Sequence, residues 1–169
     1  MAKSTFSGPV QSLAGFISAG VNNSVSLTAD TTLTVDAHVG KILLCNDADG
    51  KFTLPSIVTT TPSDPTDPNQ TNNIGATFNF YIETAATDLD IKTDGTDKFK
   101  GAILIAVDDG AKKAFVPAAS NDVITMNGST KGGIVGSIVS FTAIDTATYL
   151  VHSSLLIGSG TIVTPYADA

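Results

Sequence analysis

The chain has no arginine and no tryptophan, and it contains only two histidines (His38, His152), one cysteine (Cys45) and one glutamate (Glu83). A small enzyme usually needs an activated nucleophile, a base of suitable pKa or a bound metal. The residue types that supply these functions are few here and lie far apart in the sequence. The composition therefore favours a structural or binding protein, and we expect neither enzyme activity nor a cofactor.

The protein is acidic, with a formal net charge of −7 and a pI of about 4.4. Affinity for nucleic acid comes largely from Lys and Arg side chains that neutralise phosphates. The tightest basic pair is Lys112-Lys113, with Lys98 and Lys100 nearby in the sequence. Lysines in such positions are typical of solvated strand edges. We expect no nucleic-acid partner.

The single cysteine cannot form an intrachain disulfide. Cys45 ends the apolar run Ile42–Cys45, which favours a small buried side chain over a reactive thiol. The N-terminal residues 1–6 lack the apolar core of a signal peptide, and no apolar run approaches the length of a membrane span. These features predict a soluble protein made in a cytoplasm, with no membrane partner.

Short apolar runs separated by turn residues fill most of the chain. The clearest strand pattern is residues 75–83, where Phe78, Phe80 and Ile82 share one side. Similar alternation starts at Ser24, turn signals recur every 8–12 residues or so, and no stretch has a convincing helical period. The pattern predicts an all-β fold, an antiparallel sandwich or barrel-like domain over residues 24–169.

Two Asp- and Gly-rich turns lie between apolar runs, at residues 47–50 and 108–110. Both predict β-hairpins, because Asp and Gly accept the positive φ angles of tight hairpin turns. Residues 46–50 also have part of a calcium-loop pattern. An EF-hand alignment on Gly50, however, places Cys45 at the first ligand position and Ser56 at the twelfth, so a turn is favoured.

Two segments fall outside the strand pattern. Residues 1–23 consist mostly of small residues with isolated apolar positions, and Gly8-Pro9 and several glycines oppose a helix. We expect an extended N-terminal arm that packs on another surface. Residues 59–73 contain three prolines among Asp, Asn and Thr, which predicts a long exposed loop. Loops of this length are often functional or disordered.

Four aspartates, Asp88, Asp90, Asp94 and Asp97, gather around one expected turn. Asp88 and Asp90 would share one strand face, so a bound cation is one interpretation. The other is that Asp is a preferred turn residue. A glycosidase pair would need a defined carboxylate separation and a raised pKa, and the sequence shows neither.

Seven segments carry short motifs made mainly of turn residues and Thr-rich strands: Ser7–Val10, Thr32–Lys41, Asn46–Pro55, Gly75–Phe80, Ile124–Gly133, Gly136–Ile144 and Gly158–Ala167. In these motifs the chain resembles small virion structural proteins of tailed bacteriophages, notably marine podovirus-like phages. The resemblance spans most of the chain. Two departures are Tyr149, where such proteins often have tryptophan, and residues 61–73, which look like an insertion.

The resemblance implies a capsid decoration (cement) protein. Such a protein binds the outside of the expanded head and bridges neighbouring subunits of the major capsid protein, commonly as a homo-oligomer, with a trimer favoured. Its location would be the capsid exterior of the virion, after synthesis in the host cytoplasm. The N-terminal arm could order on the shell, and we expect it to supply capsid contacts through Phe6, Val10, Leu13 and Phe16.

The alternatives belong to other classes. A tail-fibre or knob module would bind host-surface glycans, with Asp64, Asp67 and Asn69 in a recognition loop. Sugar binding also favours exposed aromatic platforms, and the chain has only three tyrosines. Two further alternatives are a binding module unrelated to phages and an enzyme that cleaves glycan or peptidoglycan. The enzyme would depend on the four aspartates between Asp88 and Asp97.

Overall fold

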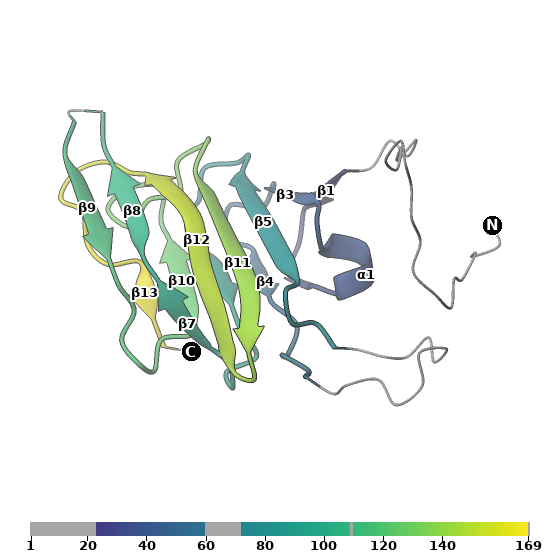
Figure 1. Ribbon diagram of the computed structural model, residues 1–169. Coiled ribbons are helices and arrows are strands. Elements are labelled where there is room, and N and C mark those ends of the chain that lie inside the picture. Colours follow the sequence, from purple (N-terminus) through teal and green to yellow (C-terminus); the bar gives the residue numbers. More distant parts are fainter. Residues whose placement is uncertain (1–22, 60–71, 109, 169) are drawn as a thin grey trace, which may run out of the picture.

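Alternating apolar and polar residues build the strands, and in the computed structural model the apolar sides of two sheets face each other (Figure 1). The structure describes residues 23–59, 72–108 and 110–168. The prediction of an all-β sandwich is confirmed. The predicted arm, apart from Asn23, and residues 60–71 of the predicted loop lie outside the described residues.

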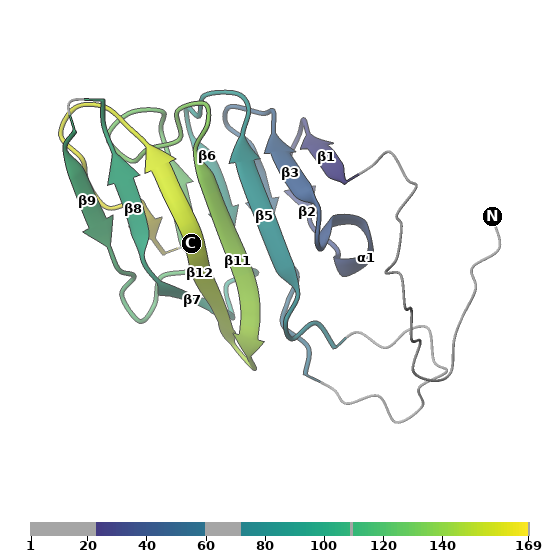
Figure 2. The ribbon, with the colours of Figure 1, turned by 45° about the horizontal axis from the view of Figure 1, so that its top comes forward.

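The larger sheet has eight strands, in the order β1-β3-β5-β11-β12-β8-β9, with β7 paired to β12 beside β8. Its strands are β1 (Ser24–Leu27), β3 (Ile42–Cys45), β5 (Thr77–Ile82), β7 (Lys98–Gly101), β8 (Ile103–Ala106), β9 (Lys112–Phe115), β11 (Ile138–Asp145) and β12 (Thr148–Ile157). Figure 2 shows β5, β11, β12, β8 and β9 side by side, with β1 beyond β3 at the opposite edge from β9.

The smaller sheet has five strands, in the order β13-β10-β6-β4-β2. Its strands are β2 (Thr31–Thr32), β4 (Lys51–Thr53), β6 (Leu89–Lys92), β10 (Val123–Met126) and β13 (Tyr166–Ala167). Among the described residues, no helix is long and apolar enough to cross a membrane.

The first six strands alternate between the two sheets, and this makes the strand pairing mixed. Strands β1, β3 and β5 are parallel neighbours in the larger sheet, and β2, β4 and β6 are parallel neighbours in the smaller one. A chain that crosses to the other sheet after each strand returns in the same direction, so adjacent strands run parallel. The expected antiparallel pairing thus holds for part of each sheet, and the parallel pairs are a correction to it.

The two predicted hairpins have different outcomes. Residues 108–110 connect β8 and β9, which pair antiparallel, so this hairpin is confirmed. Residues 47–50 connect β3 of the larger sheet to β4 of the smaller one, so the hairpin predicted there is wrong. Both turns have the same local chemistry, and the sheet that receives the next strand decides which connection forms.

A short helix, α1 (Val35–His38), replaces part of a predicted strand. Alternation over residues 32–35 predicts an extended chain, but after the buried Leu33 the chain must return to the larger sheet to begin β3. A helical turn makes this crossing. His38 helps to hold it, because its Nδ1 accepts a hydrogen bond of 2.9 Å from the Thr34 amide.

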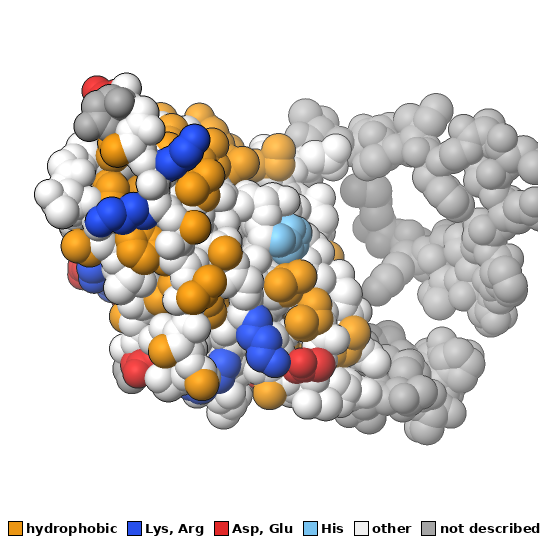
Figure 3. Space-filling view, turned by 60° about the vertical axis from the view of Figure 1, so that its left-hand side comes forward, with side chains coloured by type: hydrophobic (Ala, Val, Ile, Leu, Met, Phe, Trp, Pro, Cys, Tyr) orange, Lys and Arg blue, Asp and Glu red, His pale blue; other side chains and the backbone are white. Residues whose placement is uncertain are grey.

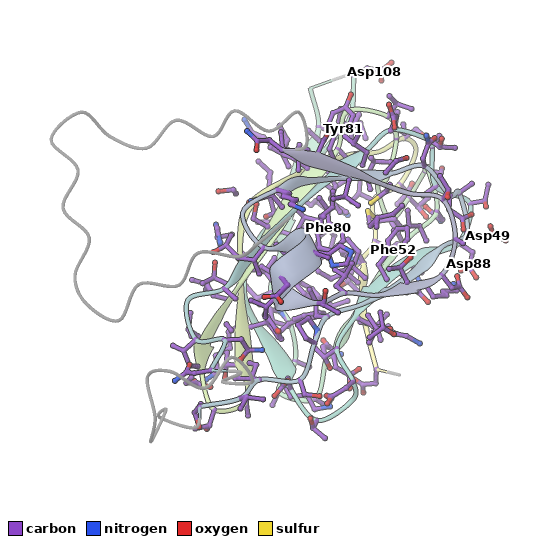
Figure 4. All side chains as sticks on the ribbon, turned by 90° about the vertical axis from the view of Figure 1, so that its right-hand side faces the viewer. Asp49, Phe52, Phe80, Tyr81, Asp88 and Asp108 are labelled. Atoms are coloured by element: carbon purple, nitrogen blue, oxygen red, sulfur yellow. The ribbon has the colours of Figure 1, made fainter. Side chains whose placement is uncertain are left out.

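An aromatic cluster joins the two sheets at the centre of the core. Phe52 of the smaller sheet stacks on Phe80 of the larger sheet, with ring centroids 6.4 Å apart (Figure 4). Phe141 lies edge-on to Phe80 at 5.6 Å and tilted against Phe99 at 5.1 Å. Phe78, Phe80 and Ile82 point inward, as the alternation predicts.

Tyr149, one of the two departures from the resembling proteins, is fully buried in this core. Its hydroxyl donates a hydrogen bond of 2.6 Å to the Pro55 carbonyl, which satisfies the polar end of the side chain inside the protein. Burial raises the pKa of Tyr149 well above its usual range.

Candidate interaction surface

The outer faces of the two sheets differ in chemistry. The smaller sheet presents Lys51, Asp90 and Lys92, and the Lys51 Nζ lies 3.0 Å from Oδ2 of Asp90. In the larger sheet, the strands β5 and β12 contain no Lys, Asp or Glu, and β11 contains one acidic residue, Asp145, at its end. The centre of the larger outer face is therefore uncharged.

A row of apolar side chains crosses the outer face of the larger sheet. Ile138 on β11 is paired with Tyr81 on β5 and with Leu155 on β12, Tyr81 is paired with Leu44, and Leu155 with Leu104. The exposed fractions are 42% for Ile138, 41% for Leu155 and 37% for Leu104. We call these five residues the apolar row. A contiguous exposed patch of this kind typically marks an interaction site.

Hydrogen-bonding side chains run beside the apolar row, and we call Thr77, Asn79, Ser140, Thr142 and His152 the polar band. The Ser140 hydroxyl donates to Oδ1 of Asn79 at 2.9 Å, and Oγ1 of Thr142 lies 2.8 Å from Nε2 of His152. These side chains largely satisfy one another. A partner can therefore cover the band at a lower desolvation cost than a band of charges would impose.

A bulge in β12 places Leu155 on the outer face. Val151 and Leu156 are both buried, yet five positions separate them, so strict alternation could not turn both inward. His152 is paired with Ser140 and Leu155 with Ile138, so β12 advances three residues where β11 advances two. Ser153 in this stretch has a φ of +47°. The extra residue re-aims the following side chains, which is a common role of bulges.

Beside the bulge, β12 changes its neighbour. Residues 148–151 pair with β7, and residues 155–157 pair with β8. The Ser154 hydroxyl donates a hydrogen bond of 2.7 Å to the Ala102 carbonyl, at the junction between β7 and β8. This bond ties the bulged part of β12 to the junction between β7 and β8, next to the pair formed by Leu104 and Leu155.

Lysines border the outer face on the β7 and β9 side. Lys112 and Lys113 are exposed on the edge strand β9, which confirms the prediction of a solvated strand edge, and Lys100 is exposed on β7. Of the pair on β9, Lys112 is on the outer side. Lys113 is on the inner side, because it is paired with the buried Ile105, and its Nζ donates a hydrogen bond of 3.0 Å to the Ile162 carbonyl. Figure 3 shows lysine side chains around a surface on which hydrophobic side chains gather. A shallow groove of about 610 Å³ lies at the same border, between β7 and residues 116–119.

The four clustered aspartates fall into two groups with different partners. Asp88 and Asp90 both pair with Lys51. Burial alone would raise the pKa of Asp94, but hydrogen bonds from the hydroxyls of Ser56 and Thr96 and from the Thr96 amide lower it to about 2. Asp97 accepts the Ile57 amide at 2.9 Å, and burial raises its pKa.

In the part of the chain that the structure describes, no three His, Cys, Asp or Glu side chains come together as a metal site. The cation interpretation of residues 88–97 thus gains no support from the geometry. Cys45 is buried, as predicted, and burial raises the pKa of its thiol far above the usual range.

The predicted site residues are not among those that the structure describes. The arm residues Phe6, Val10, Leu13 and Phe16, and the loop residues Asp64, Asp67 and Asn69, all lie outside the described ranges. Sequence reasoning missed the apolar row. Alternation in residues 75–83 does place Tyr81 on the outer side, but the outward positions of Ile138 and Leu155 depend on sheet pairing and on the bulge.

Comparisons with models of known families, with curated proteins and with solved structures found no match for this chain.

Proposed function

We propose that this protein is a decoration protein of a tailed-bacteriophage capsid, which binds the outer surface of the assembled head and bridges neighbouring major capsid subunits. Two observations support the proposal. The short motifs from Ser7–Val10 to Gly158–Ala167 resemble those of small phage virion proteins. The observation that carries most weight is the broad, uncharged and partly apolar outer face of the larger sheet, whose chemistry suits contact with another protein.

The mechanism of such a protein is linkage. A ligand that binds the assembled shell and not its separated subunits stabilises the shell by mass action. Many copies in symmetric positions multiply the effect of a modest interface. Under this proposal the protein acts as a brace across subunit seams while packaged DNA pushes the shell outward. A homo-oligomer, with a trimer favoured, would let one unit engage several seams.

The glycan-binding alternative receives less support from the described residues. Of the three tyrosines, Tyr149 and Tyr166 are buried, and Tyr81 is partly buried within the apolar row. Among the described residues there is thus no freely exposed tyrosine or tryptophan that could serve as a sugar platform. The exposed chemistry suits contact with another protein, which agrees with the decoration proposal.

The copy number in the virion tests the proposal most directly. Quantitative mass spectrometry of purified virions should find hundreds of copies, in a simple ratio to the major capsid protein, because a decoration protein follows the symmetry of the shell. A handful of copies would instead point to a tail, fibre or vertex component. Absence from the virion would overturn the proposal.

Removal of residues 2–16 tests the predicted arm. We expect the truncated protein to lose binding to heads that lack this protein, while its thermal unfolding stays within a few degrees of the full chain. A full-length variant in which Phe6, Val10, Leu13 and Phe16 are all replaced by Ser is a second test, and it should lose binding to the same degree. Unchanged binding of both variants to heads would contradict the role given to the arm.

A further inference from the structure

We infer that the outer face of the larger sheet, centred on the apolar row, lies against the shell, and that it fits a protein surface that is apolar at its centre and acidic at its margin. The inference rests on the proposed function and names the surface through which that function would act. Size, charge and the position of the chain's N-terminal end each support it.

The face is large enough for a specific protein interface. Strands in a sheet lie about 4.8 Å apart, so a path of seven strands is roughly 30 Å wide. The eight residues of β11 rise roughly 27 Å. The other strands of the sheet have between four and ten residues, so the face offers roughly 700 Å², which is close to one side of a standard-size interface. The apolar row supplies the kind of centre that interface cores have.

The charge pattern selects the partner. The centre of the face carries no Lys, Asp or Glu, whereas Lys100 and Lys112 border it on one side of a protein whose net charge is −7. A symmetric pair of this chain would bring the same lysine border to both sides of the interface. Carboxylates at the partner's margin would complement this border, and such complementarity steers and orients association. A surface of different composition therefore fits better than a second copy.

The N-terminal end of the described chain lies at the margin of the same sheet. Strand β1 is the edge strand opposite β9, and it begins at Ser24 (Figure 2). The preceding residues, which are predicted to contact the shell, thus join the protein beside the outer face. The point where the predicted arm joins the described chain therefore belongs to the sheet that carries the apolar row.

The test uses full-length protein and preformed heads that lack it, with bound protein quantified after sedimentation. Leu155→Glu and Ile138→Glu place a charge in the apolar row, and each should weaken binding at least tenfold. Val163→Glu is the matched control, because Val163 is 43% exposed but lies outside both sheets. It should change binding less than about twofold. Lys112→Glu should weaken binding and make it less sensitive to salt.

Thermal unfolding and sedimentation velocity of each variant separate the outcomes. If a Glu variant fails to fold, Leu155→Ser and Ile138→Ser replace it, with a smaller loss of binding expected. Face variants that bind heads like the wild type would overturn the inference and leave the proposed function standing. Variants that lose self-association but keep head binding would assign the face to a second copy and also overturn it. Wild-type protein that fails to bind heads would overturn both.

Discussion

Replacing Gly101 with Ala is expected to destabilise the fold by at least about 3 kcal/mol. Gly101 ends β7 with a φ of +108°, a region that side chains with a Cβ rarely occupy. An added Cβ would lie 2.1 Å from the Val151 carbonyl oxygen in the paired strand β12. Backbone strain and a backbone clash therefore act together at this residue.

The clash at Gly101 cannot be relieved cheaply, because β12 is fixed on both sides of the contact. Val151 is buried in the core, and the bulge that follows it is held by the hydrogen bond from Ser154 to Ala102. A shift of β12 would also disturb the pairing of Leu155 with Leu104. We therefore expect the Gly101→Ala variant to lose both stability and the regular outer face.

Gly95→Ala is the matched control for Gly101→Ala. Gly95 has a similar φ of +94°, but an added Cβ meets nothing within 4 Å. Its replacement should cost only the backbone strain, about 1 kcal/mol. Urea unfolding of both variants measures the difference, which reports the close approach of β7 and β12. Equal losses of stability would show that the contact with Val151 is not tight.

Replacing Phe141 with Ala should reduce the free energy of unfolding by about 3–5 kcal/mol. Phe141 is fully buried, and its ring contacts those of Phe80 and Phe99. Truncation removes this burial and leaves a cavity in the aromatic cluster between the sheets. Since domains are commonly stable by only 5–15 kcal/mol, the loss is a large fraction of the total. The melting temperature should fall by roughly 10 °C.

Phe115→Ala provides the comparison for Phe141→Ala. Phe115 lies on the edge strand β9 and is only partly buried against the core. The same change there should cost about 1–2 kcal/mol, because less apolar area is removed from contact. Calorimetry of the two variants would contradict the central role of the aromatic cluster if Phe115→Ala proved the more damaging substitution.

Core and surface substitutions should separate stability from binding. Phe141 lies between Ser140 and Thr142 of the polar band, so its backbone supports the outer face while its ring supports the core. Changes at Ile138 and Leu155 should alter binding to heads with a smaller effect on unfolding than a core substitution, because both residues are exposed on the outer face. If only the destabilised variants lost binding to heads, the residues of the face would support the fold and would not contact the partner directly.

Local patterns in the sequence determine the strands and their inward sides. Period-two alternation identifies Phe78, Phe80 and Ile82 as core residues, and the structure buries all three. The apolar run ending at Cys45 predicts a buried strand, and β3 lies there with its cysteine inside. The lysine pair predicts a solvated edge, and β9 is that edge. These predictions succeed because each depends on neighbouring residues alone.

Only the tertiary structure decides which strands become neighbours. The turns at residues 47–50 and 108–110 have similar chemistry, yet one crosses between sheets and the other closes a hairpin. Strand β5 pairs with β11, which follows it by more than fifty residues. Alternation gives the side to which a residue points within its own strand, but it contains no information about the strand beside it or the sheet that receives it.

The apolar row depends on this second kind of information. Ile138, Leu155 and Leu104 come from three strands, and their alignment requires both the long-range register and the bulge at Ser153. The all-β class and the inward-facing residues of the clearest strand followed from the sequence by itself. The mixed pairing, the helical turn at residues 35–38 and the candidate surface followed from tertiary packing, because distant segments compete for the same core.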